Sequence, residues 1–333
     1  MNLRKLHSAA LVLLILFSAG CKPSASVDST KAVKSNEKIG AFSADTAYKY
    51  VAEQVAFGPR VPGTAAHDSC ANYIVERLHG LGPDTVIVQT GTVTAFNGDV
   101  LPIKNIIAQY NKFQTKRILL AAHWDTRPWA NRDDSHEKRL LPADGANDGG
   151  SGVGVLLEIA RNLAEKSPSV GVDLFFIDAE DYGDSSGFSE NSDTWCLGSQ
   201  YWADNVVPYT ADNMPVYGIL LDMVGGRDAR FNYEAFAQEN ATKPTVKVWS
   251  EAESLGYGER FPRSIGGAVT DDHVVLTRAG IPTTDIIELN NPETLSFPPS
   301  WHTHNDNLSN IDKETLQVVG DVVLNVVYKE KPF

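Results

Sequence analysis

Acidic and imidazole side chains stand directly after several apolar runs of the sequence. They are His123 and Asp125 after the run 117–122, Glu180 and Asp181 after the run 172–177, and Asp222 after the run 217–221. Short apolar runs of this kind are typical of strands buried on both faces of a parallel sheet. Because ligands of open α/β sheets bind beyond the carboxyl ends of the strands, we expect these side chains to meet in one carboxylate-rich basin.

Two further segments carry polar side chains that could complete this basin. The glycine-rich turn 144–152 holds Asp148 at the start of an apolar helix, and Trp301 and His302 follow a Pro-Pro loop near the C-terminus. The turn lacks both the Gly-x-Gly-x-x-Gly fingerprint and the lysine of a phosphate-binding loop. We therefore do not interpret the turn as a phosphate site.

The residue types favour a metal-dependent reaction. Carboxylates and a few imidazoles without cysteine suit a borderline cation such as zinc. Three protein ligands and one open position would be a catalytic arrangement, in which the ion polarises a carbonyl oxygen. Glu180 and Asp181 are neighbours and cannot point the same way in an extended chain, so one is expected to bind the metal and the other to transfer protons.

These residues are positioned by alternating helical and strand patterns, which run from Phe42 onward without an internal repeat. Strand patterns cover 85–88, 105–110, 117–122, 172–177, 217–221 and 284–289, and helical patterns cover 44–57, 68–81, 152–163 and 245–255. This alternation predicts one α/β domain with a central mixed, mostly parallel sheet that is flanked by helices on both faces.

The N-terminal segment predicts export. A basic pair at Arg4-Lys5, an apolar run at 9–17 and small residues before Cys21 are typical of a secretory signal over residues 1–20. The run is too short to span a bilayer. Cys21 resembles the acylated cysteine of a bacterial lipobox, although Ser18 stands where leucine is usual. We therefore expect lipidation at Cys21 and a periplasmic, membrane-anchored lipoprotein of a Gram-negative bacterium.

Residues 21–40 are rich in serine, lysine and aspartate and predict a flexible tether, with an ordered arm as the alternative. Residues 41–333 then form the catalytic domain. Its two cysteines, Cys70 and Cys196, lie far apart without a recognisable spacing, which favours buried free thiols over a disulfide.

Composition excludes several classes of protein. The 333 residues are 42% hydrophobic, which is enough for a sizeable core and excludes wholesale disorder. Forty-two acidic residues against 29 basic ones give a net charge of −13. No basic cluster is longer than the pair at Arg4-Lys5, so we expect no nucleic acid partner.

The order of the polar residues resembles a known clan of exopeptidases, which contains the co-catalytic dizinc aminopeptidases and the animal-type glutaminyl cyclases. The matching residues, spread over about 42–330, are His123, Asp125, Asp148, Glu180, Asp181, Asp222 and His302. Two details are similar to the cyclase branch: Asp271-Asp272-His273 precedes a strand, and Trp301 directly precedes His302. The animal cyclases carry glutamate at the position of Asp181, and their disulfide has no counterpart here.

The resemblance implies a role for each residue. Asp148, Asp181 and His302 would bind one zinc ion, and Glu180 would shuttle the proton. Asp222 and Asp271 would hydrogen-bond to Glu180, and Trp301 and Trp195 would line the substrate pocket. His123 and Asp125 would support the site without binding the metal. A zinc exopeptidase-like fold is also implied.

Three hypotheses for function follow. The first is cyclisation of N-terminal glutamine in peptides or exported proteins to pyroglutamate, with release of ammonia. The second is a dizinc aminopeptidase, in which His123 would bind a second zinc. The third is a surface-anchored binding module without activity. The presence of all the expected ligand types argues against this third hypothesis.

Overall fold

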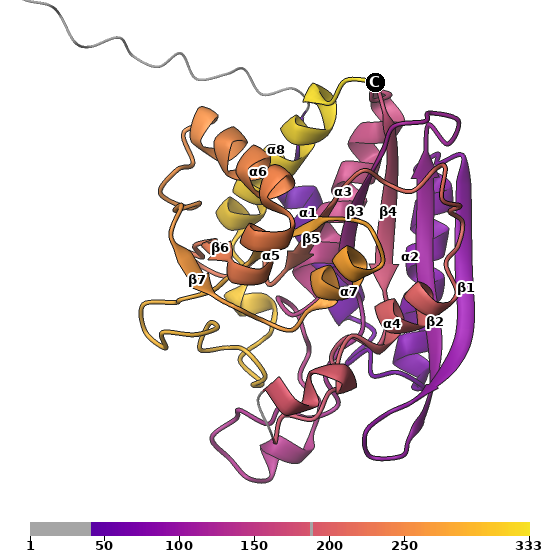
Figure 1. Ribbon diagram of the computed structural model, residues 1–333. Coiled ribbons are helices and arrows are strands. Elements are labelled where there is room, and N and C mark those ends of the chain that lie inside the picture. Colours follow the sequence, from indigo (N-terminus) through magenta and orange to yellow (C-terminus); the bar gives the residue numbers. More distant parts are fainter. Residues whose placement is uncertain (1–40, 187–188) are drawn as a thin grey trace, which may run out of the picture. The chain divides into compact units, whose positions relative to one another are not determined.

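The computed structural model describes residues 41–186 and 189–333 as an α/β domain (Figure 1). The predicted signal, the tether and Cys21 lie outside the described residues. A six-stranded sheet forms the centre, in the order β1-β2-β4-β3-β5-β8. Its strands are β1 Thr85–Thr94, β2 Val100–Tyr110, β3 Arg117–His123, β4 Gly171–Ile177, β5 Gly218–Asp222 and β8 Thr283–Ile287.

The sheet is mixed, as expected from the sequence. Strand β2 pairs antiparallel with both β1 and β4, whereas β4, β3, β5 and β8 run parallel to one another. The carboxyl ends of the four parallel strands therefore lie at one edge of the sheet. A small two-stranded sheet is formed by β6 Tyr233–Glu234 and β7 Ile265–Gly267.

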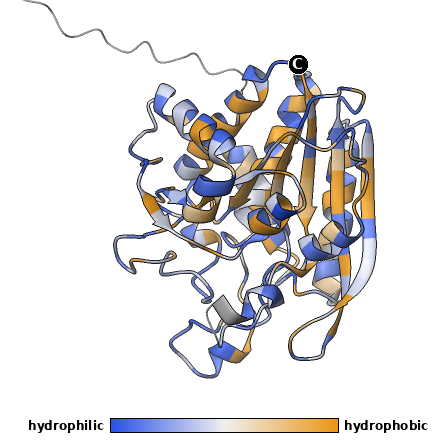
Figure 2. Cartoon of the chain, viewed as in Figure 1, coloured by the Kyte–Doolittle hydropathy of each residue, from blue (hydrophilic) through white to orange (hydrophobic). Residues whose placement is uncertain are grey.

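Helices cover both faces of the central sheet, and its inner strands β3, β4 and β5 are buried and mostly apolar (Figure 2). On β3, Ile118 and Leu120 pack into the larger core with α1, α3 and α8, while Leu119 and Ala121 pack on the opposite face. Trp202 of α4 and Leu276 of α7 cover that second face. The helices are α1 Ala44–Val55, α2 Ala65–Gly80, α3 Gly150–Glu165, α4 Leu197–Asp204, α5 Ala235–Asn240, α6 Thr242–Ser254, α7 Asp272–Arg278 and α8 Lys313–Lys329, with short 3₁₀ helices η1 Lys138–Leu140, η2 Ser189–Thr194 and η3 Leu308–Asn310.

Side-chain caps explain where several helices begin. Ser43 Oγ accepts a hydrogen bond from Thr46 N before α1, and Asp312 Oδ1 accepts from Glu314 N before α8. Each cap satisfies a backbone N–H that has no partner within the helix. Helices α4, α5 and α8 were not expected from the sequence, and β1 and β2 are longer than their predicted runs.

Both cysteines of the described domain, Cys70 and Cys196, are buried and free, which confirms the expectation for them. In the described part of the chain, no helix combines the length and the apolar character needed to cross a membrane.

A buried ion pair joins the amino ends of β3 and β4. Arg117 Nε donates to Asp173 Oδ2 over 2.9 Å, and both side chains are almost fully buried. Arg117 Nη1 also donates to the backbone oxygen of Asn111, just beyond the end of β2. The pair therefore fastens three strands at the end of the sheet that lies opposite His123.

We predict that Asp173→Asn lowers the free energy of unfolding by about 3 kcal/mol, because it leaves the buried Arg117 charge without a counter-charge. Urea unfolding would measure the loss. The matched control is Glu253→Gln, which breaks the exposed pair of Glu253 and Arg263 and should cost less than about 1 kcal/mol. Equal losses in the two variants would contradict a structural role for the buried pair.

Candidate functional site

Side chains from the ends of the parallel strands converge, as the sequence predicted. His123 ends β3 and Asp222 ends β5, and the distance from His123 Nε2 to Asp222 Oδ1 is 3.2 Å. Asp148, just before α3, lies with its Oδ1 atom 3.1 Å from the same His123 nitrogen. All three side chains are buried. The carboxyl edge of the sheet thus gathers acids around one imidazole.

A second group of donor atoms lies next to the first. His302 Nε2 is 3.2 Å from Asp181 Oδ1 and 3.6 Å from Asp148 Oδ2. The three residues are buried and their donor atoms lie within 4.8 Å of one another. Two carboxylates and one imidazole form a donor set that zinc uses in catalytic sites, so these residues fit a zinc ion.

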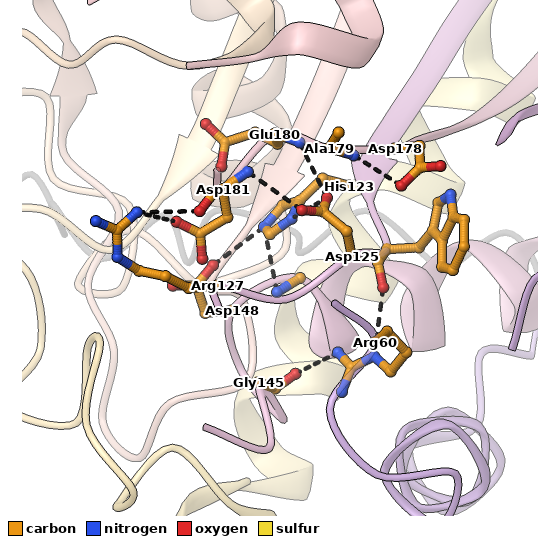
Figure 3. A network of polar contacts seen from close by, with 12 residues as sticks. Arg60, His123, Asp125, Arg127, Gly145, Asp148, Asp178, Ala179, Glu180 and Asp181 are labelled. Carbon is orange, nitrogen blue, oxygen red and sulfur yellow. Dashed lines mark hydrogen bonds and ion pairs between the residues drawn. The ribbon is translucent and has the colours of Figure 1, made fainter. Parts of the chain in front are cut away.

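The carboxylate of Asp125 orients the loop that follows β4 (Figure 3). Its Oδ1 atom accepts from Glu180 N over 3.0 Å, and its Oδ2 atom accepts from Asp181 N over 3.2 Å. Oδ1 also lies 3.4 Å from His123 Nδ1. One buried side chain therefore fixes the positions of both neighbouring acids and the orientation of the His123 ring.

The turn that carries Asp148 is held by two residues that the sequence analysis did not identify. Asp306 accepts from Asn147 N over 2.7 Å and from Asp148 N over 3.1 Å. The buried Arg60 donates to the backbone oxygen of Gly145 over 2.7 Å (Figure 3). Asp306 follows His302 by four positions, and this closeness in sequence was the signal that could have indicated it.

Arg127 was also missed, although it stands two positions after Asp125. Its Nη1 atom donates to the backbone oxygen of Asp181 over 3.0 Å and lies 3.4 Å from Asp181 Oδ1. Its guanidinium carbon lies 4.7 Å from the centre of the Trp195 ring. Arg127 thus links an expected metal ligand to an expected wall of the substrate pocket.

Burial shifts the pKa values of the metal-facing residues. Loss of solvent raises the pKa of Asp181 to about 6, although Arg127 opposes this rise. Burial and the nearby Arg127 charge hold the pKa of His302 well below its ordinary range. The His302 ring is therefore neutral, which is the form that binds a metal ion.

A chain of buried acids lies behind Glu180. Burial raises the pKa of Glu180 well above its ordinary value, and the charges of Asp271 and Asp181 raise it further. Burial raises the pKa of Asp222 to about 8, with Asp148 and Asp271 adding to the shift. Acids held this close together in low dielectric cannot all ionise, so the group retains protons.

Asp285, on β8, extends this chain of acids and was not identified from the sequence. A carboxylate oxygen of Asp285 lies within 4.8 Å of one of Asp271 and of a His273 ring nitrogen. Burial raises the pKa of Asp285 well above its ordinary value, and the charge of Asp271 contributes. Asp271 therefore has carboxylate oxygens of two other acids, Glu180 and Asp285, within 4.8 Å.

Both expected pocket tryptophans lie beside His302. The Trp301 ring stacks on the His302 ring with centres 3.8 Å apart, and the Trp195 ring is nearly parallel to it at 6.2 Å. Trp301 also packs against Phe297 and the buried cluster of Met223, Ile287 and Leu289. The metal-facing imidazole therefore has apolar surface next to it.

Strained backbone borders the site. Four non-glycine residues adopt positive φ angles there, and they are Ala179 at 48°, Cys196 at 57°, Met223 at 48° and His302 at 56°. Each is a site residue or stands next to one in the sequence. Such conformations cost free energy and are retained where neighbouring structure fixes them, as at sites that orient functional side chains.

Comparisons with known proteins agree with this geometry. A profile of peptidase family M28 matches residues 105–327. The chain is 47% identical to a glutaminyl cyclase of Bacteroides thetaiotaomicron, with a TM-score of 0.84 over 88% of this chain and 100% of that one. It is 45% identical to a structure described as a leucine aminopeptidase precursor from the same species, with a TM-score of 0.82 over 88% of this chain and all of that one.

A curated animal relative is more distant. The bovine glutaminyl-peptide cyclotransferase is 23% identical over 293 residues, which cover 79% of this chain and 76% of the bovine protein. These matches confirm the zinc exopeptidase-like fold expected from the sequence. The chain therefore belongs to peptidase family M28, in the branch of that family that it shares with bacterial and animal glutaminyl cyclases.

Proposed function

We propose that this protein is a glutaminyl-peptide cyclotransferase, which converts the N-terminal glutamine of peptides or exported proteins to pyroglutamate and releases ammonia. The observation that carries the proposal is the 47% identity to a glutaminyl cyclase over 88% of the chain. The group of Asp148, Asp181 and His302, with Glu180 beside it, supports the same activity.

The proposed cofactor is one zinc ion, held by Asp148, Asp181 and His302. Bound there, zinc would act as a Lewis acid on the side-chain amide carbonyl of the substrate. Asp125, Asp306 and Arg127 hold the backbone of the two carboxylate ligands, Asp181 and Asp148, through the hydrogen bonds described above. The ligands are thus oriented by contacts that do not depend on the substrate.

Glu180 is the proposed proton shuttle. The substrate carries its own nucleophile, the α-amine, and its own electrophile, the side-chain amide, so the protein has to select a reactive conformer rather than unite two molecules. Glu180 would accept the proton of the α-amine and deliver it to the departing ammonia. The raised pKa of this carboxyl suits a group that both takes and returns a proton.

Asp222 and Asp271 are proposed to hydrogen-bond with Glu180 or with the substrate amine once a substrate is bound. Because Asp222 and Asp271 lie in a cluster of buried acids, at least one acid of the cluster keeps its proton and can donate a hydrogen bond. Trp301 and Trp195 would enclose the short glutamine side chain. Their apolar surface would exclude water, whose attack would otherwise yield glutamate instead of pyroglutamate.

A dizinc aminopeptidase is the second candidate, and one observation favours it. His123, Asp148 and Asp222 form another group with donor atoms within 4.8 Å of one another, and it shares Asp148 with the first. A second ion there would make the pair of metals that such peptidases use. We propose instead that His123 hydrogen-bonds to Asp222 and Asp125 and binds no metal.

We also propose export through the signal at residues 1–20 and anchoring through a lipid on Cys21. The mature protein would then be a periplasmic lipoprotein of a Gram-negative bacterium. Residues 21–40 would connect the lipid to the catalytic domain at 41–333.

Purified enzyme should reduce the mass of a peptide with N-terminal glutamine by one ammonia, as measured by mass spectrometry. Glu180→Gln should lower kcat roughly a hundredfold to ten-thousandfold, because it removes the proton-accepting carboxylate, while the zinc content stays unchanged. Loss of a whole N-terminal residue would indicate the peptidase. Full activity of the variant would exclude Glu180 as the shuttle.

Metal analysis of the purified chain should give one zinc per molecule. Asp181→Asn should leave the protein with less than one zinc after dialysis, because a neutral amide is a poorer ligand than a carboxylate. His123→Ala should retain one zinc. Two zincs in the unaltered protein, with one of them lost in His123→Ala, would instead support the dizinc aminopeptidase.

The lipid anchor predicts a difference between two forms of the full chain expressed in a Gram-negative host. The unaltered protein should enter the detergent phase on Triton X-114 partitioning, and Cys21→Ser should remain in the aqueous phase. Identical partitioning of the two forms would contradict acylation of Cys21.

A further inference from the structure

Cys196 lies in contact with the carboxylate of Glu180. The distance from Cys196 Sγ to Glu180 Oε1 is 3.3 Å, and the thiol is in position to donate. Cys196 is 1% exposed, so the contact is shielded from solvent. Among the residues that the structure describes, no other side chain or backbone group donates a hydrogen bond to this carboxylate.

The backbone around Cys196 is fastened to the same loop independently of the thiol. Cys196 N donates to the backbone oxygen of Glu180, and Leu197 N donates to that of Ala179, each over 2.9 Å. A side chain at Gly198 would have its Cβ only 1.8 Å from the backbone oxygen of Asp178, so the two segments lie in close contact. The Glu180 main chain therefore remains fixed when the Cys196 side chain is truncated.

From these contacts we infer that Cys196 is a positioning residue, whose thiol holds the Glu180 carboxylate in the orientation needed for proton transfer. The inference rests on the proposed function of Glu180. A glutamate side chain has three rotatable bonds, and main-chain contacts leave all three free. The hydrogen bond from the thiol restricts them, and a carboxylate held in place transfers protons more effectively than a mobile one.

The surroundings keep Cys196 in the form that can donate. Burial raises the pKa of the Cys196 thiol well above its ordinary value, and the charges of Glu180 and Asp272 raise it further. A thiol that stays protonated is a weak hydrogen-bond donor and a poor nucleophile. These properties suit a positioning residue and exclude a role as a reactive thiolate.

The test compares Cys196→Ala and Cys196→Ser with the unaltered enzyme on a peptide with N-terminal glutamine. Cys196→Ala should lower kcat about tenfold without changing KM, because it removes the hydrogen bond that orients the Glu180 carboxyl group. Cys196→Ser should lose less, since its hydroxyl can still donate. Zinc content and the midpoint of thermal unfolding should stay close to those of the unaltered enzyme in both variants.

Cys70→Ala is the matched control, because Cys70 is the other buried free thiol of the described domain and packs in the main core. It should keep the kcat of the unaltered enzyme. The inference is overturned if Cys196→Ala turns over at the unaltered rate, or if Cys196→Ala and Cys196→Ser lose activity equally. Absence of cyclisation by the unaltered enzyme would instead refute the proposed function, which keeps the two failures distinct.

Discussion

The structure concentrates negative charge where water is largely excluded, and this electrostatic constraint governs the site. Asp148, Asp181 and Asp222 are buried within reach of two imidazoles, and Glu180 and Asp271 lie behind them. Buried carboxylates are tolerated only when they are paired, hydrogen-bonded, protonated or bound to a cation. Asp125 and Asp306 meet this condition through backbone N–H groups. Asp181 is partly neutralised by Arg127, whose Nη1 atom lies 3.4 Å from Asp181 Oδ1, and a divalent ion would meet the condition for Asp148 and Asp181 together.

The sequence predicted the parts of the site that depend on strand ends. His123, Glu180 and Asp222 follow apolar runs, and parallel pairing of those runs is sufficient to bring them together. Arg127, Asp285 and Asp306 were not predicted, because each acts through contacts whose partners are distant in sequence or are set by loop conformation. Helix α8 was missed for a related reason: its valine-rich interior has low intrinsic helix propensity, and packing against α1, α3 and α6 stabilises it as a helix.

The residues with positive φ angles show how the fold directs side chains in ways that a regular strand could not. A strand sends neighbouring side chains to opposite faces, so Glu180 and Asp181 need a sharp change of backbone direction after β4. Ala179 supplies it with a φ angle of 48°, and the Asp125 carboxylate holds the two residues that follow. His302 also adopts a left-handed conformation, which changes the backbone direction in the C-terminal segment of the site in the same way. The free energy of these conformations is offset by the hydrogen bonds that fix the adjoining backbone.

Asp148 explains how one arrangement of residues can serve two related chemistries. Its Oδ1 atom faces His123, and its Oδ2 atom faces His302, so one carboxylate borders both groups of potential ligands. The difference between one metal and two then depends on what the His123 nitrogens bind. Here Nδ1 is next to Asp125, while Nε2 lies 3.2 Å from both Asp222 Oδ1 and Gly149 N. Both nitrogens of the His123 ring thus have hydrogen-bonding partners. Among the described residues, the Nε2 atom of His302 faces only carboxylate oxygens, so His302 is more available as a metal ligand. Under the proposed function, the number of metal ions would therefore be set by the hydrogen bonds of one histidine, with every residue of the candidate metal site retained.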